Sequence, residues 1–163
     1  EGFIDGVKGV TIGAIIIGLA VTLGTVSSSL GTATYIVGSL GSVLPPLILP
    51  ASFLGICMLI SFSTGTSLGT YAVVLPLAMP LAVEVSNLAQ LSDPTLFLTL
   101  CFGAVIGGAV YGDNCSPISD TTILSSVATG CDLMDHVYTQ LPMATLASAI
   151  AAVLYTVAVL FTF

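Results

Sequence analysis

The sequence has very little charge. Only 6% of its 163 residues are charged, whereas a soluble domain carries about a quarter. Cations are scarcest, because Lys8 stands alone and there is no arginine. Nucleic-acid binding needs clustered cations, so the composition argues against a nucleic-acid partner. The same scarcity removes the usual signal for membrane orientation, which counts Lys and Arg in loops.

Metal-ligating side chains are also few. There is one histidine, and the four cysteines at 57, 101, 115 and 131 form no Cys-x-x-Cys pair. This pattern argues against a zinc site, and we expect no cofactor. Cys57 and Cys101 lie inside apolar runs, where we expect them to pack as small hydrophobic side chains.

Long uncharged runs make up most of the chain instead. The sequence is 56% hydrophobic, and no charged residue occurs from position 9 to position 83; the mean hydropathy is +1.16. A spanning helix needs about 20 apolar residues. The sequence therefore predicts a single all-α membrane domain of about three to four spans, surrounded by a lipid bilayer.

The first predicted span covers 10–37. Its first half is rich in small residues, which allow close helix packing in lipid. Its second half, "TVSSSLGTATY", carries many hydroxyl groups. Two interpretations remain open: a buried face that bonds to neighbouring helices, or a helix that unwinds near Gly31 and contributes oxygen atoms to a site.

An uncharged segment follows at 42–85 and is interrupted in its middle. Prolines crowd its start, and "SFSTGTSLGT" (61–70) separates its two arms. Backbone that leaves the helix at membrane depth is tolerated only where protein or a cavity surrounds it. The segment is either two full spans with a surface loop or a re-entrant hairpin. The uncharged tip favours the hairpin.

The motif "GDNCSPISDTT" (112–122) interrupts the next apolar run. Ser92, Asp93 and Pro94 predict a helix start before it. Ser116 followed by Pro117 also reads as a helix start, so we expect Gly112–Ser116 not to be helical. The sequence predicts a broken helix over 95–130, stopped at Gly130, with a solvated surface loop as the alternative. A final span is predicted over 137–163, with Pro142 as a kink.

The motif places carboxylates where lipid is expected. A charged Asp at the membrane centre costs about 2.5–3.5 kcal/mol, and no cation lies nearby in the sequence. Carboxylate, carbonyl and hydroxyl oxygens suit hard cations, and a proton can compete with a metal ion for one Asp. Such competition would support antiport. The candidate ligands are Asp113, Asn114, Ser116, Ser119, Asp120, Thr121 and Thr122, with Asp113 and Asp120 as the Na⁺ candidates.

Several stretches resemble the NhaC-type Na⁺/H⁺ antiporter family. They are "LGTATYIV", "SFSTGTSLGTYAVVLPLAMPLA", "GAVIGGAVYGDNCSPISDTTILSS" and "GCDLMDHVYTQLP", in that order. The match covers nearly the whole chain and corresponds to the C-terminal half of a typical member. The family belongs to a group of ion transporters with inverted repeats, each with a re-entrant hairpin and a discontinuous helix. Leu68 departs from the pattern, where a tryptophan is expected.

The resemblance implies a secondary transporter and no enzyme, with Na⁺ and H⁺ as the transported ions and a prokaryotic inner (plasma) membrane as its location. It assigns the site to Asp113, Ser116, Ser119, Asp120 and Thr121 on the broken helix. At the hairpin tip it adds Ser63, Thr64, Thr66 and Ser67. We expect the chain to be a fragment, or a half-transporter that needs the N-terminal half, a partner chain or a second copy of itself.

Two alternatives remain open, one with a different substrate and one with a different class of function. An ion-coupled transporter of organic acids or amino acids would share the fold. An intramembrane aspartyl protease is a remote alternative, because such enzymes carry their two aspartates on different helices, whereas Asp113 and Asp120 share one segment.

Overall fold

The computed structural model describes residues 45–163 continuously and, before them, only residues 11, 15, 18–19, 21–23, 25–26, 29–31 and 35. From residue 45 onward the described chain consists of helices and their connections, without a strand. In order they are η1 (Pro46–Ile48), α3 (Leu49–Thr64), α4 (Ser67–Ala89), α5 (Pro94–Cys115), α6 (Asp120–Thr129), α7 (Leu133–Val159) and η2 (Leu160–Thr162).

Four helical segments of the described chain are long and apolar enough to cross a membrane. They are Pro46–Thr64, Ser67–Ala89, Pro94–Cys115 and Leu133–Thr162. The prediction of an all-α membrane protein is therefore confirmed. The predicted span 10–37, apart from scattered positions, lies outside the described residues and stays a prediction.

Capping residues set the helix boundaries. Asp93 caps α5 through a 2.9 Å hydrogen bond from the Leu96 N–H to its Oδ1, and Pro94 occupies the first turn. Asp132 caps α7 in the same way through the N–H of Met134. Gly130 ends α6 with a φ of 68°, a left-handed conformation that glycine adopts readily. The boundaries at Asp93 and Gly130 confirm the sequence predictions.

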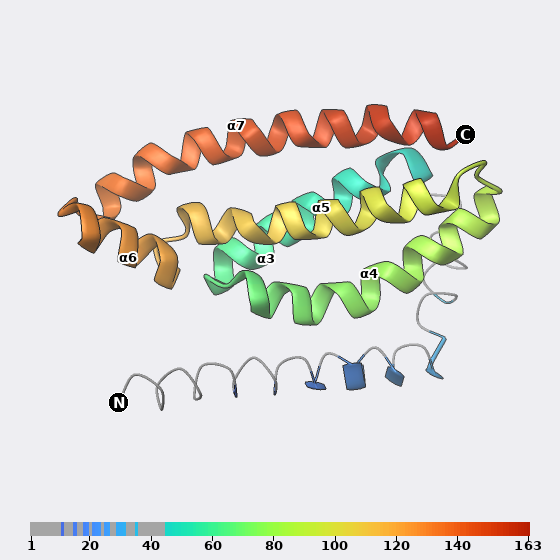
Figure 1. Ribbon diagram of the computed structural model, residues 1–163, viewed down its shortest axis with the longest axis horizontal. Helices are drawn as coiled ribbons and strands as arrows, with labels where there is room; N and C mark the ends of the chain where they lie inside the picture. The colour runs from blue at the N-terminus through green and yellow to red at the C-terminus, as the bar shows by residue number, and fades with distance from the viewer. Residues whose placement is uncertain are drawn as a thin grey trace.

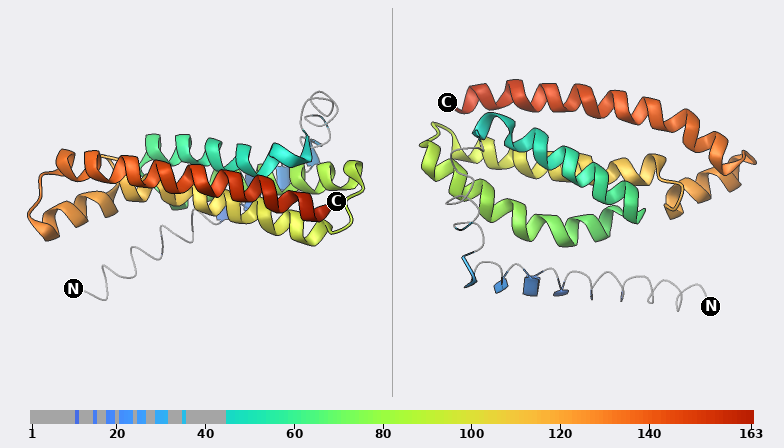
Figure 2. Two further views of the ribbon diagram at one scale, coloured as in Figure 1. Left: turned by 90° about the horizontal axis from the view of Figure 1, so that it is seen from above. Right: turned by 180° about the vertical axis from the view of Figure 1, so that it is seen from behind.

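Helix α5 lies at the centre of the bundle (Figures 1 and 2). It packs against α3, α4 and α7, and α3 also contacts α7. The apolar core forms where these helices face one another, and α7 contributes least to it because most of its surface is exposed. The core side chains on α3 and α5 are Leu49, Phe53, Leu54, Cys57, Phe97, Cys101, Ala104 and Val105.

Helices α3 and α4 form a helical hairpin with a two-residue tip. Gly65 ends α3 with a φ of 69°, and Thr66 is extended and caps α4. The predicted non-helical stretch 61–70 is therefore too long, because a left-handed glycine followed by a cap reverses the chain within two residues. Each arm is long enough to be a span, so the re-entrant arrangement stays a prediction.

The break after α5 lies later than the sequence predicted. Helix α5 continues through Gly112 to Cys115, and only Ser116–Ser119 are non-helical. The expectation that Gly112–Ser116 are not helical was wrong for all but Ser116. Ser116 ends α5, with its N–H 2.8 Å from the Gly112 carbonyl, because a residue before proline disfavours the helical region.

Helix α6 starts only at Asp120, after the N-cap position Ser119. The Ser116–Pro117 pair is therefore a helix end and not the predicted start. Helix α5 alone has 22 residues, which suffices for one span. The discontinuous-helix arrangement over 95–130 consequently stays a prediction.

Pro142 lies inside α7 and Pro76 and Pro80 lie inside α4, without ending either helix. The end of α7 is joined to the loop before α5. The N–H of Ser92 is 2.8 Å from the Thr162 carbonyl, and the Ser92 hydroxyl is 2.6 Å from the Phe163 carbonyl.

Candidate functional site

The hairpin tip and the break after α5 contact each other. The backbone N–H of Ser67, at the start of α4, donates to Asp113 Oδ1 across 3.2 Å. The Ser116 hydroxyl donates to the Phe62 carbonyl across 2.7 Å. A Cβ at Gly65 would lie 2.8 Å from the backbone of Ile118. Two interruptions that are about 50 residues apart in the sequence thus form one junction.

Asp113 lies at the positive end of α4. The first N–H groups of a helix lack intrahelical acceptors, and the helix dipole favours negative charge there. The sequence offered no cation near Asp113, and the described residues from 45 onward contain neither Lys nor Arg. The start of α4 therefore supplies the electrostatic partner that the sequence did not reveal.

The backbone carbonyl of Asp113 joins the two helices that flank the break. It accepts hydrogen bonds from the hydroxyls of Thr121, at 2.7 Å, and Thr122, at 2.9 Å. The Thr121 hydroxyl also pairs with the Ser119 hydroxyl at 2.8 Å. Ser116, Ser119 and Thr122 are buried. These bonds hold the first turn of α6 against the last turn of α5.

Ser61 is a buried part of the junction that the sequence analysis missed. Its hydroxyl is 3.0 Å from the Gly108 carbonyl and 3.1 Å from the Gly112 N–H. These two groups belong to residues four positions apart on α5, the spacing of a helical backbone hydrogen bond. One side chain of α3 therefore bonds to both the carbonyl and the N–H of that pair. A Cβ at Gly112 would collide with the carbonyl of Ser61. The sequence signal for this contact was the spacing of Gly108 and Gly112, four residues apart on α5.

The hydroxyls of Ser63, Thr64 and Thr66 bond within the hairpin itself. Ser63 and Thr64 are exposed, and their hydroxyls donate to carbonyls of their own helix, those of Leu59 and Ile60. Thr66 uses its hydroxyl to accept from the Gly69 N–H, at 3.4 Å.

Two predicted ligands on the broken segment are not joined to Asp113. Asp120 is exposed, and the Thr121 N–H donates to its Oδ1 across 2.9 Å. Asn114 is exposed and donates to the Val110 carbonyl on its own helix. Within the described residues, no three His, Cys, Asp or Glu side chains gather to hold a metal ion. The junction therefore centres on one carboxylate, that of Asp113, among backbone and hydroxyl groups.

Comparison of the sequence with known proteins identifies the family. The model of the Na⁺/H⁺ antiporter family matches residues 1–159. An uncharacterized protein of Haemophilus influenzae is 37% identical over 155 residues, which are 95% of this chain and 28% of that protein. The malate-2H⁺/Na⁺-lactate antiporter of Bacillus subtilis is 31% identical over 88% of this chain and 28% of its own length.

A further relative is the Na⁺/H⁺ antiporter NhaC of Alkalihalophilus pseudofirmus, 34% identical over 59% of this chain and 19% of its own length. The chain thus spans 28% of the length of the first two relatives. No solved structure matches it. The four apolar helices make it an integral membrane protein, and its bacterial relatives agree with a plasma-membrane location. The chain belongs to the Na⁺/H⁺ antiporter family, a family of membrane transporters and not of enzymes.

Proposed function

We propose that this chain carries the ion site of a secondary transporter that exchanges Na⁺ for H⁺, and that Asp113 binds either ion in turn. The observation that carries the proposal is the position of Asp113, whose carboxylate lies at the start of α4 while its carbonyl binds the start of α6. Irregular backbone beside a carboxylate, at the ends of two helices, is a recurring arrangement of ion sites in secondary transporters.

The depth of the junction supports a site inside the membrane. The Tyr111 hydroxyl, one turn before Cys115, pairs with the Thr145 hydroxyl of α7 at 2.9 Å. The uncharged run from Val137 to Phe163 begins in α7 and ends after η2. At the rise of an α-helix, Thr145 lies about 12 Å from the start of this uncharged run and about 27 Å from its end. In Figure 1, α6 and the first part of α7 extend beyond the hairpin tip. These features favour the re-entrant hairpin and the discontinuous helix.

The hydrogen bonds at the tip favour a cation over an organic anion. Ser63 and Thr64 already donate their hydroxyl hydrogens to Leu59 and Ile60, so they present lone pairs to a ligand. Lone pairs and a carboxylate suit Na⁺, whereas a carboxylate substrate needs donors. The name of the Bacillus subtilis relative includes malate and lactate, so organic-acid exchange is the second candidate.

The proposed transporter also includes protein beyond one copy of this chain. Ser63, Thr64 and Asp120 are exposed in the chain alone, and the relatives are more than three times as long as the aligned segment. We propose that the remainder of a longer protein, or a second copy of the chain, covers this side of the junction.

The test is Na⁺-dependent proton flux in proteoliposomes that contain the complete natural protein. Asp113→Asn should abolish the flux, because an amide neither binds a proton nor carries the negative charge. Asp135→Asn is the matched control: Asp135 is exposed in the first turn of α7 and its substitution should leave the flux near the wild-type level. Normal flux from Asp113→Asn would remove this residue from the site.

The transported species is decided in the same vesicles. Potassium, malate and lactate replace sodium in separate experiments, with an imposed pH gradient in each. Proton movement driven by sodium alone supports the proposal. Movement that requires an organic acid would favour the second candidate and contradict simple Na⁺/H⁺ exchange.

A further inference from the structure

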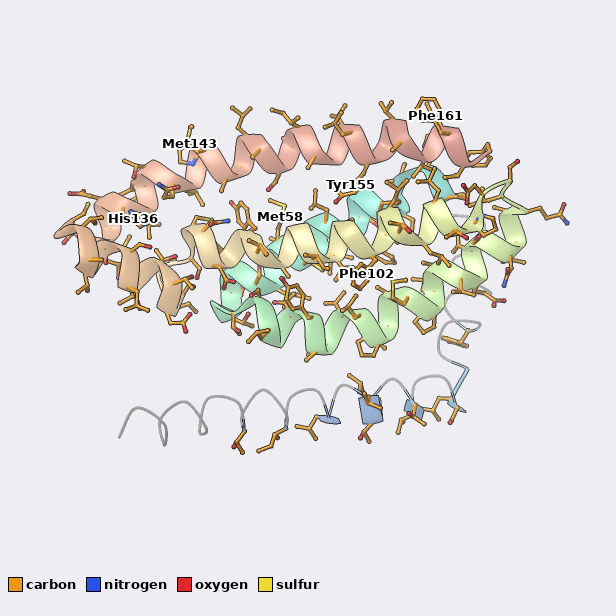
Figure 3. The ribbon with its side chains drawn as sticks, viewed as in Figure 1. Met58, Phe102, His136, Met143, Tyr155 and Phe161 are labelled. Atoms are coloured by element: carbon orange, nitrogen blue, oxygen red, sulfur yellow. The ribbon has the colours of Figure 1, made fainter. Side chains whose placement is uncertain are left out.

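A partly open pocket lies between α5 and α7. Its volume is about 240 Å³. Leu54 of α3 forms one wall, and the small residues Gly107, Ala144, Ala147 and Ala151 leave its centre empty. Figure 3 labels Tyr155 on the side of α7 that faces α5, and Met143 and Phe161 along the same helix. The Tyr155 hydroxyl reaches α5, where a Cβ at Gly103 would lie 3.1 Å from it.

Polar atoms line this pocket without protein partners. Asn114, Ser148 and Tyr155 all border it. Within the described part of the chain, no hydrogen bond is found for Asn114 Oδ1, Ser148 Oγ or Tyr155 Oη. Polar atoms in a membrane segment are costly when nothing bonds to them. An occupant that donates and accepts hydrogen bonds would pair these three atoms.

The pocket uses a different face of α5 from the junction. Gly107, Tyr111 and Asn114 are three and four positions apart, which places them on one helix face, and this face borders the pocket. Asp113 instead contacts the start of α4. The pocket is thus a separate feature of the bundle and does not belong to the proposed ion site.

We propose that water fills this pocket and that it brings aqueous solvent into the membrane interior between α5 and α7. A buried water needs two to four polar partners and takes about 30 Å³ of liquid volume, so the space holds several. A lipid tail would fill the volume but leave the three polar atoms unpaired. The pocket reaches Asn114, the neighbour of Asp113 in sequence, so it also extends solvent to the depth of the break.

The test measures how fast cysteines on α7 react with a charged, membrane-impermeant methanethiosulfonate reagent. The complete protein is kept in membrane vesicles opened to both sides, with the exposed Cys131 changed to Ser. Ala147→Cys faces the pocket. Ala149→Cys is the matched control, because it is exposed at nearly the same depth but outside the pocket lining. Thiols react as thiolates, which water must solvate, so Ala147→Cys should react at least about tenfold faster.

A second variant tests whether the polar lining holds the water. Ala147→Cys combined with Ser148→Ala and Tyr155→Phe should react more slowly than Ala147→Cys alone. Slow reaction at both 147 and 149 would overturn the proposal, because lipid or another protein segment would then fill the pocket. Equally fast reaction at both positions would also overturn it. So would an unchanged rate in the combined variant, provided that its amount in the membrane matches the single variant.

Discussion

Gly65 meets two constraints at the hairpin tip. Its φ is 69°, and a Cβ there would lie 2.8 Å from the carbonyl of Ile118. The first constraint applies equally to Gly130, which has a φ of 68° but no atom within 4 Å of the position that a Cβ would take. Comparing substitutions at the two glycines therefore distinguishes the effect of backbone strain from the effect of contact between the tip and the break.

We predict that Gly65→Ala destabilises the protein more than Gly130→Ala. Both changes add the left-handed strain of about 1–2 kcal/mol, and only Gly65→Ala adds overpacking of about 1–3 kcal/mol. Thermal unfolding of the two purified variants in detergent measures the difference. Equal losses of stability in the two variants would mean that Gly65 does not contact Ile118 closely in the folded protein.

The sequence predicted most of the residues that form the junction, but not which groups bond to one another. Asp113 and Ser67 were both candidates, yet their bond uses the backbone N–H of Ser67, and every residue other than proline carries such a donor. Ser61 was missed because a serine in an apolar helix ordinarily bonds to its own backbone. It does so here through Met58, at 3.2 Å, and it also reaches α5.

At the scale of helices, α3 and α5 approach closely because α5 has no side chains at the crossing. A Cβ at Gly108 would lie 2.7 Å from Cys57 Cβ, and one at Gly112 would lie 2.9 Å from the Phe62 nitrogen. Close approach of small residues is the usual basis of helix association in lipid. The same approach lets Ser61 bond to both Gly108 and Gly112.

We predict that Gly112→Ala and Gly55→Ala have opposite effects on stability. The added methyl at Gly112 pushes α3 from α5, at a cost of about 1–3 kcal/mol, and should also weaken Na⁺ binding at Asp113. Gly55 lies within α3 with nothing within 4 Å of its Cβ position, so alanine there should gain up to about 1 kcal/mol of helix propensity. Unfolding midpoints report the stability of both variants, and the sodium concentration for half-maximal flux reports Na⁺ binding.

A destabilised Gly55→Ala would contradict this account of α3, since it would require a neighbour that the structure lacks at that position. If Gly112→Ala lost stability without any change in sodium dependence, Gly112 would contribute to helix packing and not to Na⁺ binding.

Helix boundaries set by local chemistry were predictable, whereas the break was only partly so. Asp93 and Gly130 act through neighbours in the sequence, and the sequence analysis predicted both boundaries. The Ser116–Pro117 pair suits either a helix end or a helix start. The Ser116 hydroxyl accepts from the Ile118 N–H at 3.4 Å, as a helix cap would, and it also donates to the Phe62 carbonyl, 54 residues away in sequence. Helix α6 nevertheless begins only at Asp120.

At the scale of the whole molecule, the two ends of the bundle should lie on opposite membrane faces. Gln90 stands between α4 and α5, and Cys131 between α6 and α7. Figure 2 shows these connections at opposite ends of the bundle. The chain from one to the other includes α5, which is long enough to cross the membrane.

We predict that native Cys131, which is exposed, and a cysteine at Gln90 react with an impermeant thiol reagent from opposite sides. Gln90→Cys is made with Cys131→Ser, and each variant is labelled in right-side-out and inverted vesicles. Reaction of both from the same side would contradict a single membrane crossing between residues 90 and 131.

The hydrogen bonds from Ser92 to Thr162 and Phe163 have a consequence for chain connectivity. They join residues up to 71 positions apart, so the segment that holds α5, α6 and α7 begins and ends at the same place. The entropy lost in closing such a loop grows only with the logarithm of its length, so a long closed segment costs little more than a short one. The α3–α4 hairpin is thus joined to a closed three-helix loop by one covalent link, at Gln90, and by its packing against α5 and α7.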